Sequence, residues 1–379
     1  MSSEWPVIPL GQVIEHRKEF IEIDDLQAYK RCRVQLHAQG IVLRDVAQGA
    51  EIKTKKQQVC RAGEFLVAEI DAKVGGFGIV PPDLDGAIVS SHYFLYEIKW
   101  QALERRFLDY FIRTPAFREQ VGAKGTTNYA AIRPKDVLDY KIPLPPLTEQ
   151  QRIVARIEEL AAKIEEAHSL RQQSSAECDA LLRAMIFEAP SQLTAMKELV
   201  QLREPDVAVQ KDEVYQFAGV YCFGRGVFKG QKKSGMDFAY PRLTRLQAGN
   251  FVYPKLMAWE GALGIVPAEC DELVVSTEFP VFTVDESRVL PETLDVYFRT
   301  PSVWPVLAGE STGTNVRRRR LNPTDFLNFK MPLPSMAAQL RLREVKHKID
   351  AIKQLQNETT PALDALLPSI LDKAFKGEL

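Results

Sequence analysis

The chain repeats itself over half its length, and this repeat constrains the fold more than any other feature of the sequence. The stretch AGEFLVAEIDAKVGGFGIVP begins at Ala62, and AGNFVYPKLMAWEGALGIVP begins 186 residues later at Ala248. At the same distance, Val89-Ser90 corresponds to Val275-Ser276 and Arg113-Thr114-Pro115 to Arg299-Thr300-Pro301. Self-similarity at a fixed distance indicates duplicated structural units. A period close to half the chain therefore predicts two domains of one design.

The repeat continues to the end of each predicted domain with a small drift in distance. Thr127-Asn128 and Thr314-Asn315 lie 187 residues apart, and Pro143-Leu144-Pro145 and Pro332-Leu333-Pro334 lie 189 apart. The order of the matched motifs does not change. We therefore predict one globular domain over residues 1–146 and a second over 190–333, each followed by a helical segment, at 147–189 and 334–379.

The segment from Thr148 to Phe187 has the apolar spacing of a coiled-coil helix. Thr148 and Gln151 fit a capping box at its start. A continuous helix of about 40 residues would be about 60 Å long and would need a partner for its apolar stripe. The stripe consists of Ile153, Ile157, Leu160, Ile164 and Ala167, followed by Cys178, Leu181 and Met185.

The second copy, from Ser335 to the C-terminus, supplies a matching stripe. It consists of Leu342, Val345, Ile349 and Ile352, followed by Leu363, Leu366, Leu367, Ile370 and Leu371. Pro361 and Pro368 are expected to kink or interrupt this helix, because proline lacks the backbone donor. We predict that the two helices pack antiparallel, with the two domains related by an approximate two-fold axis.

The globular segments combine strand and helix patterns without regular βαβ alternation. AIVSSHYFLYEI and ELVVSTEFPVFTV alternate as strands do, whereas ALERRFLDYFIRTPAFREQV indicates short helices. A doubly wound sheet is therefore not expected. The predicted fold class is mixed α+β: two similar α/β domains joined by two long antiparallel coiled-coil helices, with a pseudo-two-fold internal repeat.

Composition limits the environment and the partners. Lys plus Arg total 49 and Asp plus Glu total 50, and the net charge of −1 excludes a histone-like polycation but not a local basic patch. The five cysteines form no CxxC motif, which favours reduced thiols over disulfides or zinc. The N-terminus resembles no secretion signal, and no apolar run approaches a membrane span. We expect a cytoplasmic protein that contacts no membrane.

The basic clusters of the sequence lie in the globular segments, outside the two long helices. A nucleic-acid reader needs cations for phosphates and polar side chains for base edges. A short basic run is equally typical of a solvated loop, but four consecutive arginines beside Thr and Asn favour DNA contact. The corresponding loop of the first copy suits close approach to a phosphate, although it also fits a plain connector. The candidate DNA-binding residues are Lys53, Lys55, Lys56, Lys124, Thr126, Thr127, Asn128, Tyr129, Arg133, Arg225, Lys229, Lys232, Lys233, Thr314, Asn315, Arg317, Arg318, Arg319 and Arg320.

Motifs for catalysis, cofactor binding and metal binding are not found. Gly224-Arg225-Gly226 lacks the spacing of a nucleotide loop, and Asn322-Pro323-Thr324-Asp325 lacks the second proline and the aromatic residue of an amino-methyltransferase motif. The five histidines have no HxH or HxxxH spacing. We predict no catalytic residue, no cofactor and no metal.

Several of these segments together resemble one family. The unit GTTNYAAIRPKDVLDYKIPLPPLTEQQRIVARIEEL, its long helix, the segment GRGVFKG and the tail LLPSILDKAFKGEL resemble the specificity (S) subunit of Type I restriction-modification systems. The resemblance covers nearly the whole chain in the order domain, helix, domain, helix. MPLPSMAAQL in the second copy departs from PLPPLTEQQR in the first, which leaves the second helix start open.

This resemblance implies a non-catalytic DNA-recognition role. The domains 1–146 and 190–333 would be target-recognition domains that each read one half of a bipartite sequence in double-stranded DNA. The helices would be spacers, and the subunit would hold two methyltransferase (modification) subunits that use S-adenosylmethionine to methylate adenine. A restriction subunit with translocase activity could join them.

Two other hypotheses remain open. One is a self-sufficient DNA methyltransferase or nuclease, which would need an adenosylmethionine loop with an Asn-Pro-Pro-aromatic motif, or a PD…ExK core. The other is a helical scaffold or interaction protein that binds no DNA. DNA binding in the presence of the methyltransferase partner separates this scaffold from the DNA reader.

Overall fold

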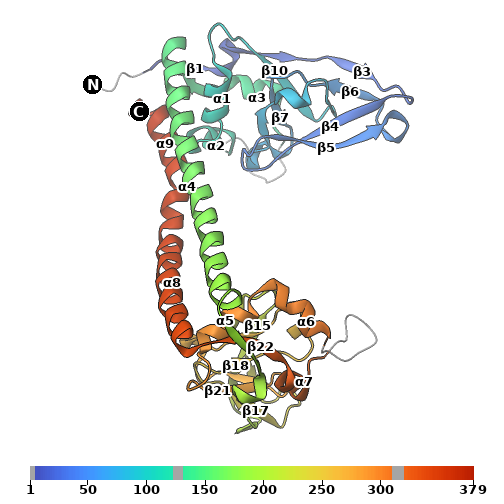
Figure 1. The fold of residues 1–379 in the computed structure, drawn as a ribbon. Helices are drawn as coiled ribbons and strands as arrows, with labels where there is room; N and C mark the ends of the chain where they lie inside the picture. The colour runs from blue at the N-terminus through green and yellow to red at the C-terminus, as the bar shows by residue number, and fades with distance from the viewer. Residues whose placement is uncertain (1–4, 123–130, 310–319) are drawn as a thin grey trace. The chain divides into compact units, whose positions relative to one another are not determined.

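The computed structural model describes residues 5–122, 131–309 and 320–379. The chain forms two compact units. Unit 1 contains Met1–Ser169 and Thr359–Leu379, and unit 2 contains Leu170–Glu358. Each unit combines sheets with short helices and with parts of the two long helical segments (Figure 1), which confirms the predicted mixed fold class.

Unit 1 contains three sheets in the part of the chain described. Their strand orders are β1-β11, β2-β10-β7-β8 and β3-β6-β9-β4-β5. Helices α1, α2 and α3 lie nearer to α4, and β3 to β6 lie at the far end of the unit (Figure 1). The strands are β1 (Val7–Pro9), β2 (Ile14–Arg17), β3 (Phe20–Glu22), β4 (Ala28–Val34), β5 (Ile41–Gln48), β6 (Lys56–Val59), β7 (Phe65–Ala68), β8 (Phe77–Ile79), β9 (Ile88–Val89), β10 (Tyr93–Ile98) and β11 (Lys141–Pro143), and the short helices are α1 (Arg105–Phe111), α2 (Pro115–Gly122) and α3 (Pro134–Asp139).

Unit 2 has the same plan. Its sheets have the orders β12-β22, β13-β21-β18-β19 and β14-β17-β20-β15-β16. The strands are β12 (Ser191–Ala195), β13 (Val200–Leu202), β14 (Val207–Ala208), β15 (Val214–Tyr221), β16 (Gly226–Ser234), β17 (Arg242–Arg245), β18 (Phe251–Val252), β19 (Gly264–Ile265), β20 (Val274–Ser276), β21 (Val281–Val284) and β22 (Lys330–Pro334), and the short helices are α5 (Pro291–Phe298), α6 (Trp304–Gly309) and α7 (Pro323–Asn328).

The strand register confirms the duplication inferred from the sequence. Strand β4 pairs with β5 through a β-bulge between Arg31 and Cys32, and β15 pairs with β16 through a bulge between Gln216 and Ala218. In each unit the same strand also has a parallel neighbour, β9 in unit 1 and β20 in unit 2. Because a one-residue slip would turn every side chain to the other face, the matching register makes residues 186 positions apart structurally equivalent.

The core of unit 1 joins its four-stranded sheet to its helices through aromatic rings. The rings of Phe77 and Phe117 meet edge to face at 5.1 Å between centroids, and Phe117 meets Phe111 at 5.7 Å. Phe375, from the far end of the chain, packs 5.1 Å from Phe111. Edge-to-face pairs contribute about 0.5–1.5 kcal/mol each beyond the area that they bury. The C-terminal helix is thus part of the core of unit 1.

Helix α4 (Leu147–Phe187) begins on unit 1 and runs antiparallel to the C-terminal helix α9 (Leu366–Phe375) there. Ile153 and Ile157 are buried in the same cluster as Leu371. Arg152, near the start of α4, donates to the Leu379 carbonyl, whereas His168, further along, faces Asp364 at 3.3 Å. Partner residue numbers therefore fall as α4 advances, as the antiparallel prediction requires.

Unit 2 contains a second antiparallel contact, between the end of α4 and α8 (Met336–Asp364). Leu182 and Ile186 pack in one cluster with Leu342. Earlier on α4, Asp179 pairs with Lys353 at 2.6 Å. Unit 2 therefore repeats the helix contact of unit 1.

The predicted apolar stripes are wrong at three positions. Leu181, Ile352 and Leu366 have exposed fractions of 51%, 48% and 45%, whereas Leu182 is only 6% exposed. Steps of four residues along α4 from Cys178 reach Leu182 and Ile186. The buried face therefore follows the straight-helix rows toward the unit 2 core and not the heptad steps.

The predicted interruption is confirmed beside Pro368, whereas an interruption at Pro361 is wrong. Helix α8 contains Pro361 without interruption, and the helix ends at Asp364 and resumes at Leu366. Pro368 lacks the N–H that would otherwise donate to the Asp364 carbonyl. The interruption therefore falls one turn before Pro368.

The start of α4 differs from the predicted capping box. The helix begins at Leu147, so Thr148 lies inside the first turn. The fully buried Gln150 makes the contacts that fix the start of the helix. Its Nε2 donates to the carbonyls of Ala102 and Pro145, both at 2.9 Å, and its Oε1 accepts from the Glu104 N–H at 2.9 Å. Gln150 thus joins the helix start to α1.

Unit 2 repeats this contact with Gln339, which is 1% exposed. Its Nε2 donates to the carbonyls of Arg288 and Pro334 at 3.2 and 3.0 Å, and its Oε1 accepts from the Leu290 N–H at 2.8 Å. We call Gln150 and Gln339 the glutamine latches.

Replacing Gln150 by alanine leaves three backbone groups without their partner, namely the Pro145 carbonyl in a buried contact and the Ala102 carbonyl and Glu104 N–H in partly buried ones. We expect the free energy of unfolding, measured by urea titration with circular dichroism, to fall by about 2–3 kcal/mol. Gln151→Ala, at the exposed neighbouring position, is the matched control and should change it by less than about 0.5 kcal/mol. Equal effects of the two variants would contradict the latch.

Candidate nucleic-acid interface

The sequence-predicted lysines of unit 1 lie at and just before β6. Lys55 pairs with Asp25 and donates to the Gly49 carbonyl at 2.7 Å, so its charge is partly used within the protein. The Lys56 ammonium lies 5.1 Å from the centre of the Phe20 ring. Lys53 is exposed and lines a hollow of the five-stranded sheet.

That hollow, which we call the arginine hollow, has a volume of about 370 Å³. It collects cations from separate strands around an apolar floor, with Glu51 as its one acidic residue. It is lined by Arg31, Cys32, Arg33, Arg44, Glu51, Ile52, Lys53, Thr54, Gln57, Ile88, Val89, Ser90 and Tyr93.

The four cations of the arginine hollow are not equivalent. Arg31 makes a two-pronged ion pair with Asp45, with Nε and NH2 donating at 2.6 and 2.7 Å. These hydrogen bonds hold the pKa of Asp45 below its ordinary value. Arg44 lies 3.6 Å from the same carboxylate. Arg33 and Lys53 are exposed, and their side chains have no hydrogen bond or ion pair with any residue that the structure describes.

The floor of the arginine hollow is buried and apolar. The Cys32 thiol lies 3.7 Å from that of Cys60, and both are free cysteines. The hydrogen bond with Cys60 lowers the pKa of Cys32, and the same contact raises the pKa of Cys60. At the rim, burial raises the pKa of Tyr93, which keeps its phenol protonated. The hollow therefore offers hydrogen-bond donors over a neutral floor.

A second hollow, which we call the histidine hollow, has a volume of about 330 Å³ and shares Tyr93 with the first. Burial, and then the charge of Lys18, lowers the pKa of His16. The hollow is lined by His16, Lys18, Phe20, Gln58, Glu69, Ser91, Tyr93, Phe94, Arg133 and Pro134. The fold thus brings two predicted residues, Lys53 and Arg133, into neighbouring hollows, although 80 residues separate them in the sequence.

Not every predicted residue can be placed. Lys124, Thr126, Thr127, Asn128 and Tyr129, together with Thr314, Asn315, Arg317, Arg318 and Arg319, lie outside the described residues. Arg320 is described, and it forms an ion pair with Glu278.

The predicted cations of unit 2 lie on β16 and on the turn before it. The Arg225 guanidinium lies 4.7 Å from the centre of the Tyr221 ring, and the Lys233 ammonium lies 5.6 Å from that of Phe217. Lys229 and Lys232 are exposed on the same strand. In unit 2, therefore, two cations rest on aromatic faces.

The equivalent positions of the two units differ in chemistry. Arg31, Arg33 and Arg44 of unit 1 correspond to Phe217, Gly219 and Gly230 of unit 2, and Lys53 corresponds to Ala239. The histidine hollow also has a counterpart of about 130 Å³, in which Glu204 stands for Lys18 and Lys255 stands for Glu69. At the positions of the arginine hollow, the shared scaffold thus carries cations in unit 1 and an aromatic residue or small residues in unit 2.

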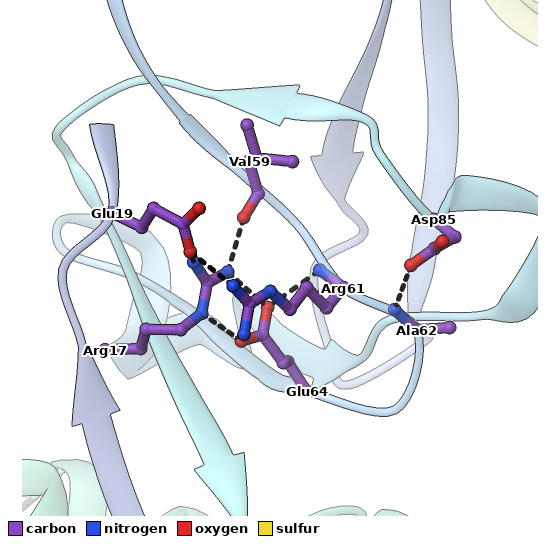
Figure 2. A network of polar contacts seen from close by, with 7 residues as sticks. All are labelled: Arg17, Glu19, Val59, Arg61, Ala62, Glu64 and Asp85. Atoms are coloured by element: carbon purple, nitrogen blue, oxygen red, sulfur yellow. Dashed lines mark hydrogen bonds and ion pairs between the residues drawn. The ribbon is translucent and has the colours of Figure 1, made fainter. Parts of the chain in front are cut away.

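A buried polar network holds the five-stranded sheet of unit 1 against the four-stranded sheet. Figure 2 shows Arg17, from the end of β2, between Glu19 and Glu64 and below the carbonyl of Val59 at the end of β6. The side chains of Arg17 and Glu64 are only 11% and 5% exposed. The hydrogen bond to Glu64 raises the pKa of Arg17 above its ordinary value.

Glu64 also organises the turn that follows β6. Its carboxylate accepts from the Arg61 backbone N–H at 2.8 Å, and Asp85 accepts from the Ala62 N–H at 2.8 Å (Figure 2). We call the contacts of Arg17 and this turn the arginine anchor. It positions the strand that precedes Cys60 and hence one wall of the arginine hollow.

Unit 2 has the same anchor with one change. Arg203 donates to the Arg245 carbonyl at 3.0 Å and to Asn250 Oδ1 at 2.8 Å. The neutral Asn250 replaces Glu64, and Asp206 supplies the charge at 3.0 Å. Asp271 accepts from the Ala248 N–H at 2.9 Å, as Asp85 does from Ala62.

Sequence reasoning missed Arg31, Arg33, Arg44 and Lys18. A signal for the first two was present, because alternation in the strand YKRCRV places residues 31 and 33 on one face. Their partners come from β5 and from the segment before β6, and local sequence does not predict which strands pair.

Among the described residues, no group of three or more potential ligands could hold a metal ion. In the same part of the chain, no helix combines the length and apolarity needed to span a bilayer.

Comparison with known proteins points to one family. Residues 2–173 match the family model described as "Type I restriction modification DNA specificity domain". No curated protein matches the chain.

Two solved structures share the fold over the whole chain. The HsdS subunit from Thermoanaerobacter tengcongensis superposes with a TM-score of 0.61 at 22% identity, covering 100% of this chain and 98% of that one. A structure described as "Structural basis underlying complex assembly and conformational transition of the type I R-M system" superposes with a TM-score of 0.69 at 21% identity, covering 100% and 99%. The architecture of both units therefore recurs in these proteins.

Removing the buried Glu64 carboxylate would leave the partly buried Arg17 guanidinium without its main partner. We expect Glu64→Ala to lower the free energy of unfolding by about 3–5 kcal/mol. Glu64→Asn should lower the free energy of unfolding by less, because Asn250 accepts a hydrogen bond from the equivalent arginine, Arg203, in unit 2. Glu19→Ala, at a carboxylate that is 48% exposed, should cost less than about 1 kcal/mol. Equal losses for Glu64→Ala and Glu19→Ala in urea titration would contradict the anchor.

Proposed function

Because the chain belongs to the family of Type I restriction-modification specificity subunits, we propose that it reads a bipartite sequence in double-stranded DNA, with one unit per half-site. The observation that carries this proposal is the contrast between an identical strand register and different surface side chains. Two readers that share a scaffold but recognise different bases would differ in this way.

The surface chemistry of each unit supports DNA as the ligand. Exposed cations without partners attract phosphates, and polar residues beside them suit base edges. In unit 1 these cations are Arg33 and Lys53, in the arginine hollow. In unit 2 the exposed Lys229 and Lys232 on β16 offer charge at the edge of the equivalent sheet.

We propose that the chain is not itself an enzyme and that partner subunits carry out the chemistry. Two methyltransferase subunits would bring S-adenosylmethionine and methylate adenine, and a restriction subunit with translocase activity would join the complex. Exposed apolar side chains on the long helices support protein docking. In unit 2 these include Leu170 and Leu355, with exposed fractions of 57% and 61%.

The test is a methylome map of cells that express the chain together with its methyltransferase partner. We expect methylated adenines within a split motif, namely two specified runs separated by a gap of fixed length and free sequence. A single continuous motif would contradict reading by two units.

Two control cultures address the alternative functions. Cells with the partner alone should lose the motif, and cells with this chain alone should show no methylation. Methylation by the chain alone would establish a self-sufficient methyltransferase. A motif that does not change when this chain is omitted would favour a scaffold.

A further inference from the structure

The arginine hollow of unit 1 is lined by more cations than carboxylates. The Arg31 guanidinium is saturated on one edge by Asp45, at 2.6 and 2.7 Å. The side chains of Arg33 and Lys53 have no hydrogen bond or ion pair with the described residues, and the Arg44 side chain is 59% exposed. Within the hollow the one opposing carboxylate is that of Glu51. The four cations of the hollow therefore outnumber its one lining carboxylate, Glu51, and the adjacent Asp45.

The shape of the hollow selects among anionic ligands. A volume of about 370 Å³ is too small for a duplex but accepts one protruding phosphodiester unit. The edges of stacked bases are recessed in the grooves, where convex elements such as helices and ribbons reach them. A concave site lined by donors suits the ridge of the DNA backbone, and guanidinium groups match phosphate oxygens in pairs.

Unit 2 has no such cation set at the equivalent place. The Phe228 ring covers Gly219, since a Cβ built there would lie 2.5 Å from that ring. Phe228 stacks on Tyr221 at 3.9 Å, and the Arg225 guanidinium lies over the other ring of this stack. The position of Arg33 in unit 1 is therefore taken by an aromatic ring in unit 2, and the position of Arg44 is taken by Gly230.

We propose that the arginine hollow is a backbone-phosphate site for duplex DNA, with Arg33, Arg44 and Lys53 as its contacts and Arg31 as a positioning residue fixed by Asp45. This inference rests on the proposed DNA-reading function and adds an asymmetry to it. At this place on the five-stranded sheet, unit 1 offers a cation-lined site, whereas unit 2 offers aromatic rings and small residues.

The test measures the affinity of the full chain, in complex with its methyltransferase partner, for duplex DNA across a range of salt concentrations. Two duplexes of equal length are used, one with the methylated motif and one without it. Each phosphate contact contributes about 0.9 to the slope of log affinity against log salt. We expect Arg33→Gln and Lys53→Gln each to reduce the slope by about 1 on both duplexes, and the triple variant with Arg44→Gln by about 2–3.

Matched controls separate charge from structure. Lys30→Gln removes a cation from the same strand as Arg33, but its Nζ is bonded to the Asp83 carbonyl at 2.9 Å, outside the hollow. It should leave the slope unchanged. Arg33→Lys keeps the charge and should retain most of the slope. Thermal unfolding midpoints equal to wild type confirm that the variants are folded.

The possible outcomes separate this inference from the proposed function. An unchanged slope in the triple variant, with DNA still bound, would overturn the phosphate site and leave the DNA-reading function intact. Loss of affinity only on the duplex with the motif would also overturn it, because that result indicates base reading. Failure of the wild-type complex to bind either duplex would overturn both.

Discussion

One partly buried arginine in each unit ties together the two larger sheets, and the placement of the proposed DNA-binding surface depends on it. Arg17 in unit 1 joins the end of β2 to the strand end at Val59, and Arg203 does the same in unit 2. A guanidinium with so little solvent access requires full pairing, since an unpaired buried charge costs several kcal/mol. Glu64 meets this requirement in unit 1, and Asn250 meets part of it in unit 2. The anchor therefore tolerates a change of partner charge but not the loss of its acceptors.

Duplication explains how one chain can combine a fixed scaffold with two different surfaces. Side chains that hold the fold together are buried and recur in both units. The glutamine latches Gln150 and Gln339 are an example. Exposed groups on the five-stranded sheets are under no packing constraint, because a surface side chain contributes little to stability. Arg33 and its counterpart Gly219 differ accordingly. The division between repeated interior and divergent exterior is what the proposed two-part reading of unlike half-sites requires.

The long helices belong to the cores of the units and are not simple connectors. Leu371 is buried in unit 1, and Leu182 is buried in unit 2. Helix α4 follows the first domain and ends in unit 2. The second helical segment follows the second domain and ends, with α9, in unit 1. Hydrophobic burial holds these helix ends in the unit cores, at roughly 1.5–3 kcal/mol for each fully buried aliphatic side chain.

Sequence by itself determined the duplication, the long helices, their antiparallel pairing and the break near Pro368, because each depends on local periodicity or on residues at fixed separations. It also located Lys53 and Arg133 as candidate DNA contacts. Only the tertiary structure decided that Leu182 and not Leu181 is buried, that Gln150 and not Gln151 fixes the helix start, and that Arg33 lines a hollow. These outcomes depend on which distant backbone groups and strands come together, and pairing between strands far apart in the chain leaves no periodic signal in the residues themselves.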